Sequence, residues 1–315
     1  MGTLVAKKYP TKLFLKAADH TYVECGTGGK GWSCWGGKTG GTAFNSGTGS
    51  TRRADAIAGS NERAGITCYL VNGVCHQAAN RILVPAGILV SAARGYALSQ
   101  AVFGPYGRAG VWPCSAPFNQ QTSVTGDLPA CTAAASPAAA RAAMKRAPKL
   151  ALSTADTAHV RSIKSLYNRF DPKAATAMDA IEFNIQLFER ELGHRFQGAL
   201  DNTALQGLRL AKTAIETGHH QLNADWVGQQ MSPVEFVRNF NRLTDRFQDD
   251  CANALKKKPQ YRRLLELSPD ERLVLADPDA LDQAFGKGTA RSVYGKLLSA
   301  AKAEAKAAST SKPKG

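Results

Sequence analysis

A cysteine at the start of a predicted helix is the residue of this chain with the clearest chemical potential. Cys75 lies in the stretch Val71-Asn-Gly-Val-Cys-His-Gln-Ala-Ala-Asn-Arg81, directly after a turn at Asn72-Gly73. The unpaired N–H groups and the positive dipole end of a helix N-terminus favour thiolate over thiol, and they can stabilise a developing oxyanion. An ordinary buried cysteine is equally compatible with this position, because free cysteine is among the most buried residue types.

A nucleophilic thiol needs a proton acceptor, and His20 is the best candidate in the sequence. On a helix the side chain of His76 would point about 100° away from that of Cys75. The other four histidines, His159, His194, His219 and His220, fall in the helix-forming C-terminal part. His20 opens a predicted strand in which alternation places His20, Tyr22 and Glu24 on one face. The sequence therefore predicts a Cys75–His20 dyad, with a solvated histidine at a sheet edge as the alternative.

The order of these residues resembles the circularly permuted branch of the papain-like NlpC/P60 superfamily, of the lecithin:retinol acyltransferase type. The histidine segment Asp19-His-Thr-Tyr-Val23 comes first, a Gly-rich excursion follows, and Asn72-Gly-Val-Cys-His-Gln77 then opens a helix. In ordinary papain-like enzymes the cysteine precedes the histidine. The resemblance covers about residues 12–110. It implies an antiparallel sheet with a central helix, Cys75 as the nucleophile and His20 as the base.

The family also has a third polar residue that orients the imidazole, usually on a strand after the histidine. In this sequence a Gly-rich segment follows, and Asn45, Asp55 and Glu62 all stay open for that role. The chain also departs from the family just after the cysteine, where Ala78 and Ala79 occupy the region of a family aromatic residue.

Composition divides the chain into two parts. Residues 1–110 hold 19 of the 29 glycines, and the runs Lys12–Lys16, Thr21–Glu24 and Thr67–Val71 have the β-branched and aromatic content of short strands. The stretch Cys25–Ser50 is predicted to be an extended loop with at most a hairpin. We expect an α+β fold with four segments: an α+β domain at 1–131, an Ala/Pro-rich linker at 132–150, a helical bundle at 151–305 and a disordered tail at 306–315.

Helix signals in the second part can be named. Ser232-Pro-Val-Glu235 and Ser268-Pro-Asp-Glu271 are capping boxes with proline at the first helical position. Asp171-Pro172 is expected to open a helix with one apolar stripe, formed by Met178, Ile181, Ile185, Phe188 and Leu192. Glu191-Leu-Gly-His194 has the spacing of a carboxylate–histidine metal motif, but we interpret it as a helix end at Gly193. His219-His220 is interpreted as a solvated turn.

Net charge and cysteine usage limit the remaining possibilities. The charge of +15 is spread along the chain, since residues 1–110 carry 12 − 4 = +8 and the rest 28 − 21 = +7. Contact with an anionic polymer or a membrane surface is therefore expected to depend on salt.

No leader or membrane span is recognisable. This predicts synthesis in the cytoplasm, with leaderless secretion as an option. It also predicts reduced cysteines by default. The cysteine spacings match no common zinc pattern, so neither a metal nor a cofactor is expected.

The sequence as a whole predicts a cysteine-dependent hydrolase or acyltransferase that acts through an acyl-enzyme. Its expected substrates are amide bonds of peptides or of peptidoglycan-like cell-wall polymers. The alternative is a non-catalytic basic binding or scaffold protein for an acidic partner such as RNA. The oligomeric state stays open.

Overall fold

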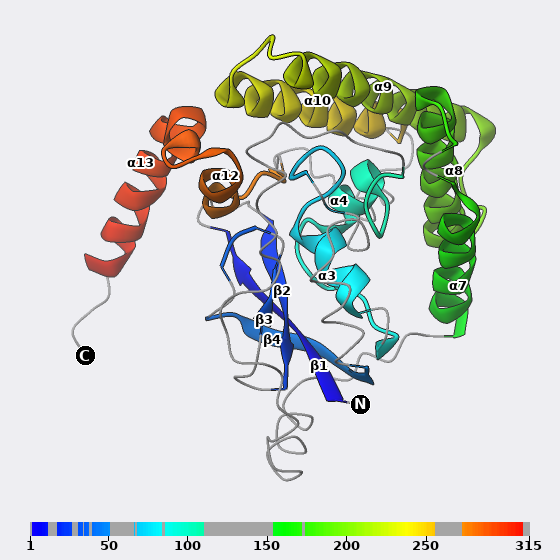
Figure 1. Cartoon of the computed structure of the whole chain (residues 1–315), viewed down its shortest axis with the longest axis horizontal. Helices are drawn as coiled ribbons and strands as arrows, with labels where there is room; N and C mark the ends of the chain where they lie inside the picture. Colours follow the sequence, from blue (N-terminus) through cyan, green and yellow to red (C-terminus); the bar gives the residue numbers. More distant parts are fainter. Residues whose placement is uncertain are drawn as a thin grey trace.

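The computed structural model describes most of the chain in two large parts. The described residues are 2–11, 18–26, 31–33, 35–37, 40–50, 66, 68–83, 86–109, 154–171, 174–255 and 273–310. Within them the fold is α+β, with one four-stranded antiparallel sheet and eight helices (Figure 1). The strands are β1 (Gly2–Pro10), β2 (Asp19–Cys25), β3 (Gly31–Trp32) and β4 (Thr42–Gly49), in the order β3-β2-β1-β4.

Strand β2 follows the alternation expected from its sequence. Val23 packs in an apolar cluster with Leu4 of β1, whereas His20 and Tyr22 lie near the ring of Tyr9. The antiparallel register places Tyr9 directly opposite His20. The stretch predicted as a long loop after Cys25 contributes β3 and β4 instead, because backbone pairing with β2 and β1 stabilises extended structure there. The strand expected at 12–16 lies outside the described residues.

Helix α3 (Cys75–Leu83) begins at the cysteine, as its sequence predicts, and packs on β2 and on α4 (Tyr96–Phe103). The segment before it is a turn rather than the expected strand. The backbone N–H of Cys68 donates to Oδ1 of Asn72 at 3.2 Å, and the N–H of Val71 donates to the carbonyl of Cys68 at 3.1 Å. The short asparagine side chain thus offers the backbone a local partner in place of a sheet ladder.

Six further helices follow in the second part of the chain. They are α7 (Thr154–Arg169), α8 (Ala177–Phe196), α9 (Asn202–Val227), α10 (Pro233–Ala254), α12 (Pro278–Phe285) and α13 (Thr289–Thr310). Figure 1 shows α9 and α10 side by side across one end of the molecule, with α7 and α8 along one flank and α12 and α13 on the other. Helix α13 continues into the segment for which the sequence predicted a disordered tail.

Three of the expected helix features need correction. Helix α8 begins after Thr176, whose hydroxyl accepts from the N–H of Asp179 in a capping box, and not at Asp171-Pro172. Met178 is 70% exposed, so the predicted apolar stripe starts one turn later. The helix also passes through Gly193 and ends at Gln197, which adopts the left-handed conformation that closes helices.

The capping-box prediction at the start of α10 is confirmed. Ser232 accepts from the N–H of Glu235, and the Glu235 carboxylate accepts from the N–H of Ser232. The second predicted capping box, at 268–271, and the predicted linker at 132–150 lie outside the described residues.

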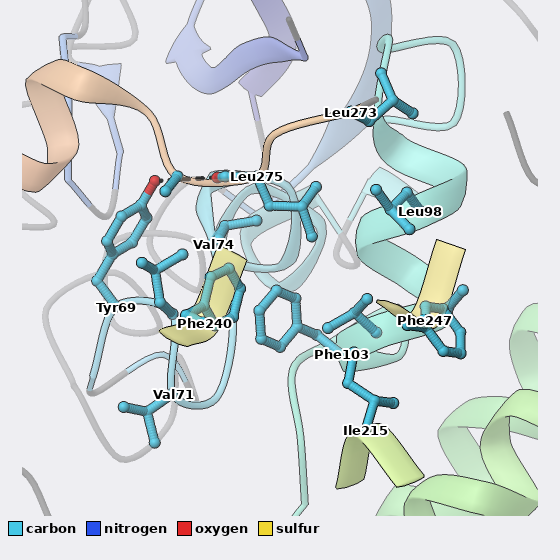
Figure 2. Close-up of a cluster of buried hydrophobic side chains, with 14 of the residues drawn as sticks. Tyr69, Val71, Val74, Leu98, Phe103, Ile215, Phe240, Phe247, Leu273 and Leu275 are labelled. Carbon is cyan, nitrogen blue, oxygen red and sulfur yellow. Dashed lines mark hydrogen bonds between the residues drawn. The ribbon is translucent and has the colours of Figure 1, made fainter. Parts of the chain in front are cut away.

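The apolar core is shared between the two parts of the chain. Figure 2 shows Leu98 and Phe103 of α4 in one cluster with Phe240 of α10 and with Leu273 and Leu275. The rings of Phe103 and Phe240 stack with centroids 6.0 Å apart. The helical part therefore packs directly against α3 and α4, the helices that surround the predicted nucleophile.

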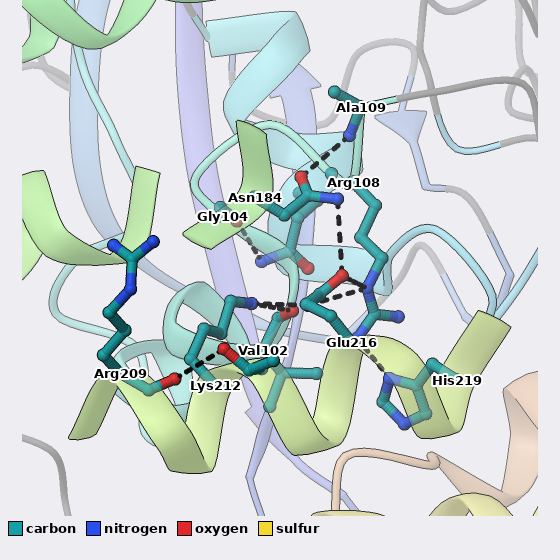
Figure 3. Close-up of polar contacts among 12 residues, drawn as sticks. Val102, Gly104, Arg108, Ala109, Asn184, Arg209, Lys212, Glu216 and His219 are labelled. Atoms are coloured by element: carbon teal, nitrogen blue, oxygen red, sulfur yellow. Dashed lines mark hydrogen bonds and ion pairs between the residues drawn. The ribbon is translucent and has the colours of Figure 1, made fainter. Parts of the chain in front are cut away.

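A buried polar network joins the same two parts (Figure 3). Glu216 of α9 accepts from the guanidinium of Arg108 at 2.9 Å and from the ammonium of Lys212 at 2.6 Å. Arg108 also donates to the carbonyl of Val71 and contacts His219. The expectation of a solvated turn at His219 is wrong, because this residue lies within α9 and is 4% exposed.

Candidate active site

The structure brings the two predicted site residues together. Strand β2 supplies His20, which is completely buried, and the first residue of α3 is Cys75, which is 6% exposed. Burial by itself would lower the pKa of His20. The negative charge and hydrogen-bonding capacity of Cys75, together with the carboxylate of Asp277, outweigh that effect and raise the pKa. A thiolate at Cys75 and the carboxylate of Asp277 therefore both favour the imidazolium form of His20.

The hydrogen bonds of His20 decide which ring nitrogen can accept a proton. Nε2 lies 3.0 Å from the carbonyl oxygen of Gly37 and 3.2 Å from the hydroxyl of Ser33. A carbonyl oxygen can only accept, so Nε2 carries the hydrogen in the neutral ring. Nδ1 is then the basic nitrogen, and among the described residues it has no hydrogen-bond partner. This free, buried nitrogen is the atom of His20 that can take the thiol proton.

A glycine segment covers the imidazole ring. Gly36 has a φ of +96°, and a Cβ atom there would lie 2.4 Å from Cε1 of His20. Its N–H donates to Oε1 of Gln283 at 2.8 Å, and the N–H of Gly37 donates to the hydroxyl of Tyr9 at 3.1 Å. The segment needs glycine both for its left-handed backbone and for its close approach to the ring.

A carboxylate that the sequence interpretation missed lies beside the same ring. Oδ2 of Asp277 is 3.8 Å from Nδ1 of His20, and Oδ1 caps helix α12 by accepting from the N–H of Ala280 at 2.9 Å. Burial raises the pKa of Asp277, while the charge of His20 acts in the opposite direction. The sequence Asp277-Pro278 is typical of a helix start, but no local signal relates it to His20.

Of the third-residue candidates named from the sequence, Asn45 does not occupy this position. Asn45 lies on β4, where its side-chain amide donates to the carbonyl of Leu89 and its oxygen accepts from the N–H of Ser46. Asp55 and Glu62 lie outside the described residues. Among the described residues, Asp277 is the carboxylate that forms an ion pair with His20.

His76, next to the cysteine, is held by other partners. Its Nδ1 lies 2.8 Å from the hydroxyl of Ser99 and its Nε2 lies 2.9 Å from the carbonyl oxygen of Asp19. Burial lowers the pKa of His76 to about 4, so the ring is neutral at physiological pH. His76 ties α3 to α4 and β2, in agreement with its exclusion as the base.

The cysteines differ in oxidation state. Cys25 and Cys68 are each disulfide-bonded, so the expectation of reduced thiols is wrong for these two residues. Cys75 and Cys251 are free and buried. Burial in an apolar environment raises the pKa of Cys251 far above its ordinary value, and this thiol is therefore inert.

Two further histidines, His159 of α7 and His194 of α8, lie close together. His194 belongs to the Glu191-x-x-His194 motif. Nε2 of His159 is 2.6 Å from Glu191, and Nε2 of His194 is 2.9 Å from Asp156. The two imidazole rings stack in parallel, with centroids 4.0 Å apart. Lone pairs in parallel ring planes cannot converge on one ion. In the described part of the chain, no group of three or more His, Cys, Asp or Glu side chains is arranged to hold a metal.

Comparison with known proteins finds no match: no protein-family model, no curated protein and no solved structure matches this chain. Within the described ranges, none of the helices combines the length and the apolar content that crossing a membrane requires.

Proposed function

We propose that the protein is a cysteine hydrolase or acyltransferase with Cys75 as the nucleophile and His20 as the base. The observation that carries the proposal is the buried Nδ1 of His20, which the Nε2 contact with Gly37 leaves free next to a thiol that opens a helix.

The geometry supports the following sequence of steps. The proton of the Cys75 thiol passes to Nδ1 of His20, and the thiolate attacks a carbonyl carbon. Helix α3 starts at Cys75, so the N–H groups of its first turn have no acceptor within the helix and can stabilise the oxyanion. The imidazolium then protonates the leaving amine, and water or a second amine resolves the acyl-enzyme.

The proposed substrates are amide bonds of peptides or peptidoglycan-like polymers, and the proposed fold relationship is to the permuted papain-like branch. The support is topological: the histidine strand precedes the cysteine helix in the chain, and the helix packs on an antiparallel sheet. Lipid esters are the second proposed class of substrate.

Rates of thiol alkylation test the proposal without knowledge of the substrate. Iodoacetamide is added to the native protein under non-reducing conditions near pH 7, and the modified cysteines are located by mass spectrometry. We expect Cys75 to react at least tenfold faster than Cys251, a free buried thiol in the same molecule whose pKa is raised by burial. His20→Ala should slow the modification of Cys75, and Cys75→Ala should abolish the fast phase. Equal rates for Cys75 and Cys251 would overturn the proposal.

A further inference from the structure

We propose that Asp277 is a positioning residue of this site, and that residues 273–285 form an integral part of the active site. We call this segment the C-terminal strap. The inference rests on the proposed function, because it assigns a role to the group that faces the proposed base. It also assigns a role to the helical part of the chain. This part contains the strap, which begins about 250 residues after His20 in the sequence.

The strap is attached on both sides of the Cys75–His20 pair. On one side, the hydroxyl of Tyr69 accepts from the N–H of Asp277 at 2.9 Å and lies 3.4 Å from the carbonyl oxygen of Leu275. Figure 2 shows this hydroxyl directed at the strap backbone. On the other side, Gln283 accepts from the N–H of Gly36, the neighbour of the residue that binds Nε2 of His20.

Apolar burial holds the strap between these two attachments. Leu273, Leu275 and Ala276 belong to the shared core and are at most 5% exposed. The position of the Asp277 carboxylate is therefore set by packing and backbone hydrogen bonds, and it does not depend on the ion pair with His20.

The charged groups around His20 define what Asp277 can do. The titratable groups that face or influence the ring are Tyr9 on β1, Cys75 and His76 on α3, and Asp277 at the start of α12. Burial raises the pKa of Tyr9 and lowers that of His76, so both are neutral near pH 7. The carboxylate of Asp277 is then left, together with the Cys75 thiolate, to balance the positive charge that His20 acquires.

The separation of 3.8 Å matters for this role. It is longer than a hydrogen bond of 2.7–3.2 Å, so the carboxylate acts through its charge and leaves the Nδ1 lone pair available to the thiol. When the proton moves from Sγ to Nδ1, the His20 ring becomes a positively charged imidazolium next to Asp277. The carboxylate thereby favours the thiolate–imidazolium pair over the neutral pair.

The test compares two neutral substitutions at helix-capping aspartates. Asp277→Asn removes the charge but keeps a good cap. Asp201→Asn is the matched control, because Asp201 caps α9 through the same bond to an N–H group three residues later, also at 2.9 Å. The alkylation rate of Cys75 is measured from pH 5 to pH 9 in both variants and in the unaltered protein.

We expect Asp277→Asn to lower the alkylation rate at neutral pH by about tenfold or more, since one charge at this distance shifts a pKa by about 1–3 units. The deficit should close at alkaline pH, where the thiolate forms without help from the imidazolium. Asp201→Asn should leave the profile unchanged. A purely structural role of Asp277 would not produce a deficit that depends on pH.

The outcomes separate the two proposals. If Cys75 reacts no faster than Cys251 in the unaltered protein, the proposed function fails. If Cys75 reacts fast and Asp277→Asn has the pH profile of the control, the proposed function stands and the role of Asp277 is overturned. Should Asp277→Asn fail to fold, Asp277→Ser provides a second neutral cap, and an unchanged profile in that variant overturns the inference equally.

Discussion

Replacing Glu216 by glutamine tests whether the buried network holds the helical part against the α3–α4 region. The Glu216 carboxylate is inaccessible to solvent and accepts from two cations, Arg108 at 2.9 Å and Lys212 at 2.6 Å. Burial opposes the ionised form, but these two cations lower the pKa of Glu216, so it is charged at neutral pH. Glutamine would leave both cations buried without a counter-charge.

The expected loss can be worked out from these contacts. A hydrogen bond to a charged group contributes about 1.5–3 kcal/mol, so two such bonds correspond to about 3–6 kcal/mol. Breaking a buried ion pair by removing one partner costs about 3–5 kcal/mol. We therefore expect Glu216→Gln to lower the free energy of unfolding by about 3–5 kcal/mol, measured by urea denaturation at pH 7.

A matched control exists on the exposed faces of α8 and α9. Glu182 of α8 pairs with Arg209 of α9 at 3.2 Å, but both side chains are more than 40% exposed. Glu182→Gln should change the free energy of unfolding by less than about 1 kcal/mol. A loss below about 1 kcal/mol for Glu216→Gln, similar to that of the control, would refute the reasoning.

Three further predictions concern single residues. The pKa of Lys212 is lowered to about 8, mainly by burial, while an unfolded lysine keeps its ordinary value near 10.5. The unfolded chain then binds more protons at this residue between pH 8 and 10.5, so the contribution of Lys212 to stability should rise with pH over that window. The free energy of unfolding of the unaltered protein relative to that of Lys212→Met should therefore rise, because Cys251 and the buried tyrosines, whose raised pKa values act in the opposite direction, are common to both proteins. Ser232→Ala removes the cap of α10 and should cost about 1 kcal/mol in urea denaturation. Gly36→Ala places a methyl group against His20 and should slow the alkylation of Cys75 by at least tenfold.

Each of these predictions has an outcome that contradicts it. For Lys212, the contradiction is a difference in free energy of unfolding between the unaltered protein and Lys212→Met that stays constant between pH 8 and 10. For Ser232, it is an unchanged unfolding midpoint. For Gly36, the control is Gly26→Ala, where φ is also positive (+68° against +96° at Gly36) but no heavy atom lies within 4 Å of the added methyl group. Equal alkylation rates in the two glycine variants would show that contact with His20 does not matter.

Short-range sequence signals determined several elements of this protein. The helix start at Cys75, the alternation along β2 and the capping box at Ser232 each depend on residues within a few positions of one another. Steric and hydrogen-bonding preferences over such distances are largely independent of the rest of the fold. For that reason the two proposed site residues and the elements that carry them could be named from the sequence.

Other features depend on packing between distant segments. The sequence interpretation missed or misassigned these features. The apolar run before Cys75 became a turn because an Asn72 side chain competes with strand pairing. His219 is buried because Arg108 and Phe240 reach it from other elements.

The position of Asp277 beside His20 was decided by tertiary structure alone. The capping signal of Asp277 indicates where a helix begins but carries no information about what faces its other carboxylate oxygen. That contact exists because Leu273, Leu275 and Ala276 are buried in a core shared with α3 and α4, which fixes the start of α12 against β2. Burial of apolar surface depends on the whole chain, so a contact between residues more than 250 positions apart has no local signature in the sequence.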